Sequence, residues 1–225
     1  MENQVKKSDF SAEDISAIYR VIEKRRDVRK FLGEQIPDDI LHRILKAGSQ
    51  APSVGYMQPW NFLLLRDLQT RKKVYDAFEK ANNEAIEMFE GERKETYKSL
   101  KLEGILESPL NICVTCDRTR FGSVILGKTC QVEMDLYSTV CAVQNLWLAA
   151  RAEGIGIGWV SIINQDELHN ILKLPDNITI IAYLCVGYTD VFAQQPELKT
   201  KNWLPEIPFP DLVFYDNWGN INSNL

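Results

Sequence analysis

One long helical pattern constrains the fold of this chain more than any other stretch. Residues 135–153 carry apolar side chains at the three- and four-residue spacing of an α-helix. The apolar positions are Leu136, Val140, Val143, Leu146, Trp147 and Ala150. Polar Gln144 and Asn145 interrupt the pattern, and the chain has no run of about 18 apolar residues that could span a membrane. So much apolar surface predicts a central helix, and a dimer interface is one place for it.

Shorter patterns around this helix complete an α+β chain. Helical spacing predicts further helices at residues 12–24, 67–90, 92–107 and 165–172, and one that begins at Pro37. Apolar runs predict strands at residues 60–65, 110–116, 157–163 and 178–187. Helices therefore come first, and strands then alternate with helices. This order predicts an α+β sandwich with a mixed sheet.

The chain shows no internal repeat and no boundary that would divide it. Its 225 residues, of which 45% are apolar, suffice for one domain with a large core. We therefore predict a single domain over residues 1–225, with terminal extensions at 1–10 and 204–225. The tail after Gly187 is rich in Pro, Trp and Phe and still has apolar side chains to bury. We expect this tail to wrap a partner subunit.

Charge and cysteine content narrow the class of protein. The formal net charge of -5 argues against a nucleic-acid binder, and residues 1–8 are polar, without the apolar core of a signal segment. The five cysteines are an odd number without a disulfide-framework spacing, which predicts a reduced, cytoplasmic setting.

Two further patterns argue against metal or triad chemistry. Cys113 and Cys116 have the CxxC spacing, but residues three apart on a strand point to opposite faces. Small core residues are therefore favoured over a redox or metal pair. His42 and His169, the two histidines of the chain, lie in polar helical patterns. Neither a serine–histidine triad nor a metal site is predicted.

The densest cluster of charge is the arginine segment, residues 25–30. The guanidinium groups of Arg25, Arg26 and Arg29 could bind a phosphate bidentately, and they stay charged at any working pH. A solvated basic helix end is the alternative. Asp27 is either a salt-bridge partner of its neighbours or a carboxylate fixed beside a ligand, where it could orient water or accept a proton. The residues alone leave both alternatives open.

Three other stretches could contribute to a site. The loop at 51–60 contains two prolines, which restrict its backbone, while Ser53 and Gln58 offer polar contacts to a heterocycle. An ordinary ordered loop is the alternative. Residues 117–134 are irregular and long enough to form a lid. The glycine run at 154–158 precedes a strand, so it is not a dinucleotide fingerprint; close passage of a ligand or neighbouring strand explains it.

These stretches together resemble a known family. Residues 25–31, read with 51–62, are similar to the FMN-binding core of the nitroreductase superfamily, where FMN is flavin mononucleotide. The closer resemblance is to the branch of aerobic 5,6-dimethylbenzimidazole synthases. The runs at residues 116–120, 134–151, 158–162 and 182–188 support that branch. The resemblance extends from about residue 20 to residue 203.

The resemblance implies a fold and an unusual reaction. The fold is a nitroreductase-like, domain-swapped homodimer with FMN at the subunit interface. Reduced FMN is the substrate rather than a recycled cofactor. Dioxygen reacts with it, and the flavin is broken down to 5,6-dimethylbenzimidazole, the lower ligand of cobalamin, and erythrose 4-phosphate. A separate flavin reductase supplies the reduced FMN, so NAD(P)H takes part only indirectly.

The resemblance also implies roles for individual residues. The implied FMN contacts are Arg25, Arg26, Asp27, Val28, Arg29, Ser53, Met57, Gln58 and Ser161. Asp27 and Ser161 are the implied catalytic residues, and Asp27 stands where ordinary nitroreductases commonly have serine. Ser161 would lie near the central flavin ring, although it could equally be an ordinary strand-end serine. Ser53 would reach FMN from the partner chain.

Other residues match the family less specifically, and two alternative functions stay open. Arg118 and Arg120 belong to the expected lid, and neither Lys199 nor Lys201 aligns securely with the phosphate-binding cation of the family. A conventional FMN-dependent NAD(P)H nitroreductase or flavin reductase is the alternative enzyme. A non-catalytic flavin carrier is the alternative from another class.

Overall fold

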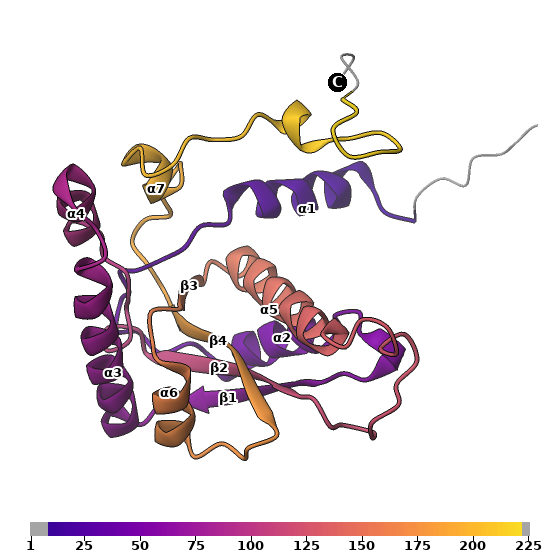
Figure 1. Cartoon of the computed structure of the whole chain (residues 1–225), viewed down its shortest axis with the longest axis horizontal. Coiled ribbons are helices and arrows are strands. Elements are labelled where there is room, and N and C mark those ends of the chain that lie inside the picture. Colours follow the sequence, from indigo (N-terminus) through magenta and orange to yellow (C-terminus); the bar gives the residue numbers. More distant parts are fainter. Residues whose placement is uncertain (1–8, 222–225) are drawn as a thin grey trace, which may run out of the picture.

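The computed structural model describes residues 9–221 (Figure 1). The central pattern forms α5 (Met134–Ala152), which lies on one face of a four-stranded sheet. The strands are β1 (Trp60–Leu65), β2 (Leu110–Asp117), β3 (Gly156–Val160) and β4 (Ile178–Gly187). With α5, α2 (Asp38–Ser49) covers one face, and α3 (Leu68–Ile86) and α6 (Gln165–Leu172) cover the other. The predicted α+β class is confirmed.

Side chains that alternate across the strands divide the core in two. Ile112 and Val114 of β2 pack toward α2 and α5, whereas Cys113 packs toward α3 and α6. Cys116 faces α5, beside Thr139. All five cysteines lie in the described part of the chain as free thiols, and burial raises the pKa of Cys113 to about 12. The interpretation of Cys113 and Cys116 as small core residues is confirmed.

The sheet differs from the mixed sheet that the sequence predicts. Its order is β1-β2-β4-β3, and each neighbouring pair of strands is antiparallel. The connections from β1 to β2 and from β3 to β4 each join neighbouring antiparallel strands, as where Leu65 at the end of β1 lies opposite Asn111 near the start of β2. The connection from β2 to β3 crosses over through α5, and β4 lies between these two strands. Parallel pairing in the described chain is limited to one bridge, between Asp27 and Ile157.

The predicted helix at 92–107 is wrong over its second half. The structure has α4 (Gly91–Lys98), and residues 99–109 are irregular. Packing overrides the helical pattern here, because Ile105 is fully buried in the core beside α3. A Cβ on Gly104 would lie 2.4 Å from the ring of Phe31, so this segment accommodates the side chain that directly follows the arginine segment.

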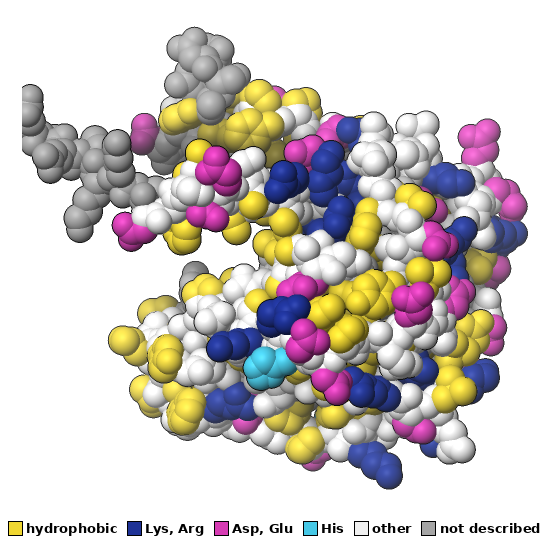
Figure 2. All heavy atoms as spheres, turned by 180° about the vertical axis from the view of Figure 1, so that it is seen from behind, with side chains coloured by type: hydrophobic (Ala, Val, Ile, Leu, Met, Phe, Trp, Pro, Cys, Tyr) yellow, Lys and Arg dark blue, Asp and Glu magenta, His cyan; other side chains and the backbone are white. Residues whose placement is uncertain are grey.

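The first helix and the tail form an arm that stands apart from the sheet. α1 (Ala12–Lys24) has the predicted bounds, and it begins at a capping box formed by Ser11 and Asp14. Its apolar side chains are exposed, namely Ile15, Ile18, Tyr19 and Ile22. The tail contains α7 (Glu197–Thr200) and a 3-10 turn, η2 (Phe209–Leu212), and it exposes Leu204, Ile207 and Phe209. Figure 2 shows a deep notch between this arm and the body.

Parts of the expected termini lie outside the described residues. The predicted extensions at 1–10 and 204–225 are described only for residues 9–10 and 204–221, and the expectation for residues 1–8 falls outside entirely. Within residues 9–221, the structure contains no helix with the length and apolar character that crossing a membrane requires.

Candidate functional site

The arginine segment leaves α1 and runs along the edge of the sheet. Arg25 caps the end of α1, and the chain then extends so that the Val28 N–H donates to the Ile157 carbonyl at 2.9 Å. Two glycines of β3 permit this approach. A Cβ on Gly158 would lie 2.1 Å from the Val28 carbonyl oxygen, and one on Gly156 would meet the Val28 side chain. The expected close passage at the glycine run is confirmed, and its partner is this segment.

Asp27 is held in place by two donors. Its Oδ1 accepts a hydrogen bond from the Trp159 N–H at 3.1 Å and pairs with the Arg29 guanidinium at 3.0 Å. The Asp27 side chain remains 47% exposed, while that of Arg29 is 18% exposed. The salt bridge of one alternative therefore exists. The carboxylate is also fixed and accessible, as the other alternative requires.

The arginine segment lines a cavity of about 710 Å³, a volume within the range of small-molecule sites. The cavity lining comes from residues 25–30, 100–102 and 189–200. The last stretch, which we call the C-terminal strap (residues 189–200), was not predicted as part of the site. Trp203, just beyond the strap, is the sequence signal for this position of the tail. The centre of its ring lies 5.3 Å from that of Phe89, a residue in the connection between α3 and α4, and this contact holds the tail there.

The cations of the cavity suit an anionic ligand. The Arg25 guanidinium lies 4.8 Å from the centre of the Trp147 ring, which fixes its direction. Among the described residues, Nε of Arg26 and NH1 of Arg29 are buried without a hydrogen-bond partner. Buried donors are normally paired, so two orphaned guanidinium donors at one cavity favour a phosphate or a polar ring edge as their acceptor.

The loop at residues 51–60, here called the Ser53 loop, forms a compact turn. Its 3-10 turn η1 (Val54–Tyr56) contains Gly55 at φ 52°, and Tyr56 and Gln58 also have positive φ. The Ser53 hydroxyl accepts from the Gln58 N–H at 3.0 Å. Met57 is fully buried. Met57 thus anchors the loop, and the FMN contacts expected of Met57, Gln58 and Ser53 stay predictions.

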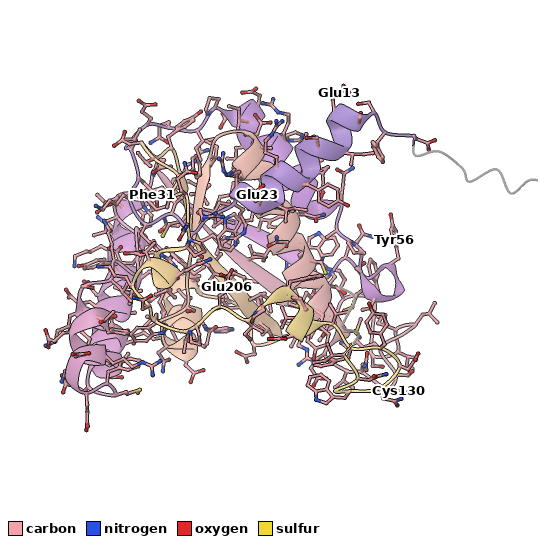
Figure 3. The ribbon with its side chains drawn as sticks, turned by 90° about the horizontal axis from the view of Figure 1, so that it is seen from above. Glu13, Glu23, Phe31, Tyr56, Cys130 and Glu206 are labelled. Atoms are coloured by element: carbon pink, nitrogen blue, oxygen red, sulfur yellow. The ribbon has the colours of Figure 1, made fainter. Side chains whose placement is uncertain are left out.

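The structure does not bring all the predicted residues together within one copy of the chain. The Ser53 loop does not line the arginine cavity, and Figure 3 shows Tyr56 and Phe31 on opposite sides of the molecule. Ser161 follows β3 and is exposed, two residues beyond Trp159, whose N–H holds Asp27. One copy of the chain therefore holds the arginine cavity without the Ser53 loop.

The expected lid, residues 117–134, packs onto the Ser53 loop. The Arg120 guanidinium donates to the carbonyl oxygens of Gln58 and Trp60. Ile125 packs so closely on Gly55 that a Cβ there would lie 2.6 Å from it. Phe121, Val124 and Leu126 are exposed. The lid segment and the Ser53 loop therefore form one unit, with apolar side chains directed outward.

A buried carboxylate holds the base of the lid segment. Asp135, at the start of α5, is fully buried and pairs with Arg118 at 3.1 Å and with Lys128. Burial alone would raise the pKa of Asp135, but the hydrogen bonds from Lys128 and Arg118 outweigh it, and the pKa lies below its ordinary value. The ion triad connects two points of the lid to α5.

The two lysines considered for phosphate do not line the cavity. Lys199 pairs with Glu206 on the outside of the tail, whereas its neighbours Leu198 and Thr200 do line the cavity. Lys201 is exposed at the end of α7. The cations that line the cavity are instead those of residues 25–30 together with Lys101.

The fold and this arginine site define a class of protein. Residues 22–188 match the Nitroreductase family, and the chain belongs to that family. The chain is 38% identical over 186 residues to the 5,6-dimethylbenzimidazole synthase of Rhodospirillum rubrum, covering 83% of this chain and 88% of the relative. It is 32% identical over 200 residues to a 5,6-dimethylbenzimidazole synthase of Rhodobacter capsulatus, covering 89% and 97%. The predicted resemblance is confirmed.

Solved structures agree on the fold. Oxidised iodotyrosine deiodinase bound to FMN and 3-iodo-L-tyrosine superimposes with a TM-score of 0.69 at 23% identity, covering 89% of this chain and 98% of that chain. The NADPH:FMN oxidoreductase of Vibrio harveyi superimposes with a TM-score of 0.67 at 19% identity, covering 92% and 80%. At these identities the likeness concerns the fold alone.

Proposed function

We propose that the protein is a 5,6-dimethylbenzimidazole synthase. It uses dioxygen to fragment reduced FMN into 5,6-dimethylbenzimidazole, for the lower ligand of cobalamin, and erythrose 4-phosphate. The observation that carries the proposal is the accessible carboxylate of Asp27, held by the Trp159 N–H and Arg29 at an arginine-lined cavity. Relatives named for this activity match most of the chain.

The residues at the cavity fit FMN as a substrate. Arg25, Arg26 and Arg29 supply the positive charge that a phosphate requires, and two of their buried donors have no partner among the described residues. Val28 lines the cavity beside them. Reduced FMN, when bound, supplies the electrons that dioxygen accepts. A separate flavin reductase must provide it, and we place the protein in the cytoplasm, where its free thiols stay reduced.

The chain's own contribution is proton transfer and exclusion of water. Asp27 is fixed where a carboxylate can take protons from a bound ligand. Ser161 is the proposed second catalytic group, which donates or accepts a hydrogen bond near the flavin ring. The lid segment, with its outward apolar side chains, would cover the ring and keep water out.

We further propose a domain-swapped homodimer, because the cavity of one copy is lined by the arginine segment but not by the Ser53 loop. The Ser53 loop and lid segment of the second copy would face the arginine cavity of the first. The exposed apolar face of α1 and the exposed Val140 on α5 supply an interface that a second copy can bury. The exposed apolar tail would lie over that copy.

Ile18→Glu tests the dimer. A charge in the centre of the apolar face of α1 should give a monomer by sedimentation and abolish measurable FMN binding, although Ile18 belongs to neither wall of the site. Arg20→Glu, on the opposite face of α1, is the control and should stay dimeric. A monomeric wild-type protein that binds FMN tightly would contradict the proposal.

The activity itself is tested by product analysis after a single oxidation. The purified protein is loaded with FMN, reduced without air and then exposed to dioxygen, and flavin absorbance and extracted products are followed by chromatography. We expect loss of flavin and appearance of 5,6-dimethylbenzimidazole in equal amounts. Quantitative return of intact FMN would overturn the proposal, and steady NAD(P)H-dependent turnover of nitroaromatics or quinones would then identify a conventional nitroreductase.

A further inference from the structure

The C-terminal strap closes one side of the arginine cavity and lies beyond residue 188, where the match to the family ends. It contributes about half of the lining residues, among them Val191, Gln194 and Leu198. The strap itself has little core to hold it, since most of its side chains are exposed. Whatever fastens the strap therefore determines whether the cavity has this wall.

Arg26 fastens the strap to the end of α1. Its NH2 group donates to the Gln194 carbonyl at 2.7 Å, across 168 positions of sequence. Its NH1 group donates to the carbonyl oxygens of Glu23 at 2.7 Å and Arg25 at 2.6 Å. One guanidinium thus joins three carbonyls, those of Glu23 in α1, Arg25 at its C-cap and Gln194 in the strap, and hydrogen bonds with an ionised donor are the strong ones.

Two other contacts hold the strap and its continuation. Arg151 at the end of α5 places its guanidinium 3.8 Å from the centre of the Phe192 ring and also donates to the Lys24 carbonyl at 3.0 Å. Trp203, past the strap, packs against Phe89. Gln194 lies between these anchors and lines the cavity, whereas Phe192 and Trp203 do not, so the bond from Arg26 acts at the cavity lining itself.

We infer that Arg26 is a positioning residue: it latches the C-terminal strap over the arginine cavity and so sets how long FMN stays bound. The inference rests on the proposed function for its ligand, but the latch itself is a property of the chain. Arg26 differs in this from Arg25, which stacks on Trp147, and from Arg29, which pairs with Asp27. Its NH1 and NH2 groups both donate to carbonyl oxygens of the protein.

Arg26→Lys distinguishes the hydrogen bond between Arg26 and the strap, here called the latch, from electrostatic attraction between the Arg26 charge and a phosphate. Lysine keeps the positive charge but offers its donors from a single nitrogen, which cannot reproduce the planar fork that joins α1 to the strap. Arg25→Lys is the matched control, since it makes the same change one residue away without touching the strap. The full-length protein without ligand is digested briefly with trypsin, and cleavage after Lys199 and Lys201 is followed by mass spectrometry.

We expect cleavage after Lys199 and Lys201 to be about tenfold faster in Arg26→Lys, because the variant loses a charge-assisted hydrogen bond, and about 1.4 kcal/mol corresponds to a factor of ten. Cleavage within α3 should be unchanged, and Arg25→Lys should behave as the wild type. Equal cleavage of the strap in Arg26→Lys and wild type would overturn the latch. If Arg26→Lys fails to fold, Arg26→Gln is digested in the same way.

A ligand measurement distinguishes the latch from a phosphate contact. Dissociation rates of FMN and riboflavin are compared in Arg26→Lys and wild type. Loss of the latch should speed both dissociations by a similar factor, because riboflavin lacks only the phosphate. Faster loss of FMN alone, with an unchanged strap, would make Arg26 a phosphate ligand and overturn the inference. If neither flavin binds the wild type, the proposed function fails while the digestion still decides the latch.

Discussion

Asp27→Asn is expected to bind reduced FMN and to return it intact after oxidation. Asparagine has the shape of aspartate, and its Oδ1 can still accept from the Trp159 N–H that holds Asp27. It lacks the charge that pairs with Arg29 and cannot take a proton at neutral pH. General-base groups contribute about 10²–10⁴ in rate, so formation of 5,6-dimethylbenzimidazole should fall at least about a hundredfold.

The measurement is the single-oxidation product analysis on the variant, together with fluorescence titration of FMN. Asp176→Asn, which changes an exposed carboxylate before β4, is the matched control and should form product at the wild-type rate. Undiminished product from Asp27→Asn would remove Asp27 from the chemistry. Loss of FMN binding in that variant would instead assign Asp27 the task of orienting Arg29, the salt-bridge alternative that the sequence leaves open.

Local patterns predicted much of the fold because local energetics decide those parts. The bounds of α1, β1, α6 and β4 follow from apolar periodicity and caps, and the structure has them where the sequence places them. The glycines at 156 and 158 correctly indicated a close approach, because a Cβ at either position would collide with another segment.

The predictions that were wrong or missing concern contacts between residues far apart in the sequence. No local pattern reveals that Phe31 sits over Gly104, which keeps residues 99–109 from forming a helix. The direction of a strand depends on the end of the sheet at which the preceding connection brings the chain back, and no local sequence pattern specifies that end. At the site, residues 25–30 line one cavity, and the binding of phosphate by their arginines stays a prediction. The acceptor of Arg26 was missed, because a backbone carbonyl 168 positions away has no signature in sequence.

Asp135→Asn is expected to destabilise the protein strongly and to release the lid segment. Asparagine keeps a possible acceptor for the Leu136 N–H but leaves Arg118 and Lys128 without their countercharge. Breaking a buried ion pair costs about 3–5 kcal/mol; because Arg118 is partly exposed, we expect about 3 kcal/mol. For a chain of this size, that corresponds to a fall in Tm of about 6–12 °C.

Calorimetry measures the first effect, and tryptic cleavage at Arg118, Arg120 and Lys128 measures the second. Asp39→Asn is the matched control: it removes an exposed carboxylate that pairs with Arg43, and such surface pairs contribute at most about 1 kcal/mol. A Tm loss no larger than that of Asp39→Asn would show that the triad adds little to stability. A large Tm loss without faster cleavage would separate the triad from the lid.

The pH dependence of stability gives an independent check on the triad. The folded pKa of Asp135 lies below its unfolded value, which is about 3.9, so the unfolded state takes up the proton first as pH falls. Its contribution is therefore present above about pH 4 and is lost as pH falls through the folded pKa. Urea unfolding at pH 7 and at pH 3 should show a smaller gap between wild type and Asp135→Asn at the lower pH. A gap of equal size at both values would mean that the ionised carboxylate is not what holds Arg118 and Lys128, and that asparagine destabilises α5 through packing alone.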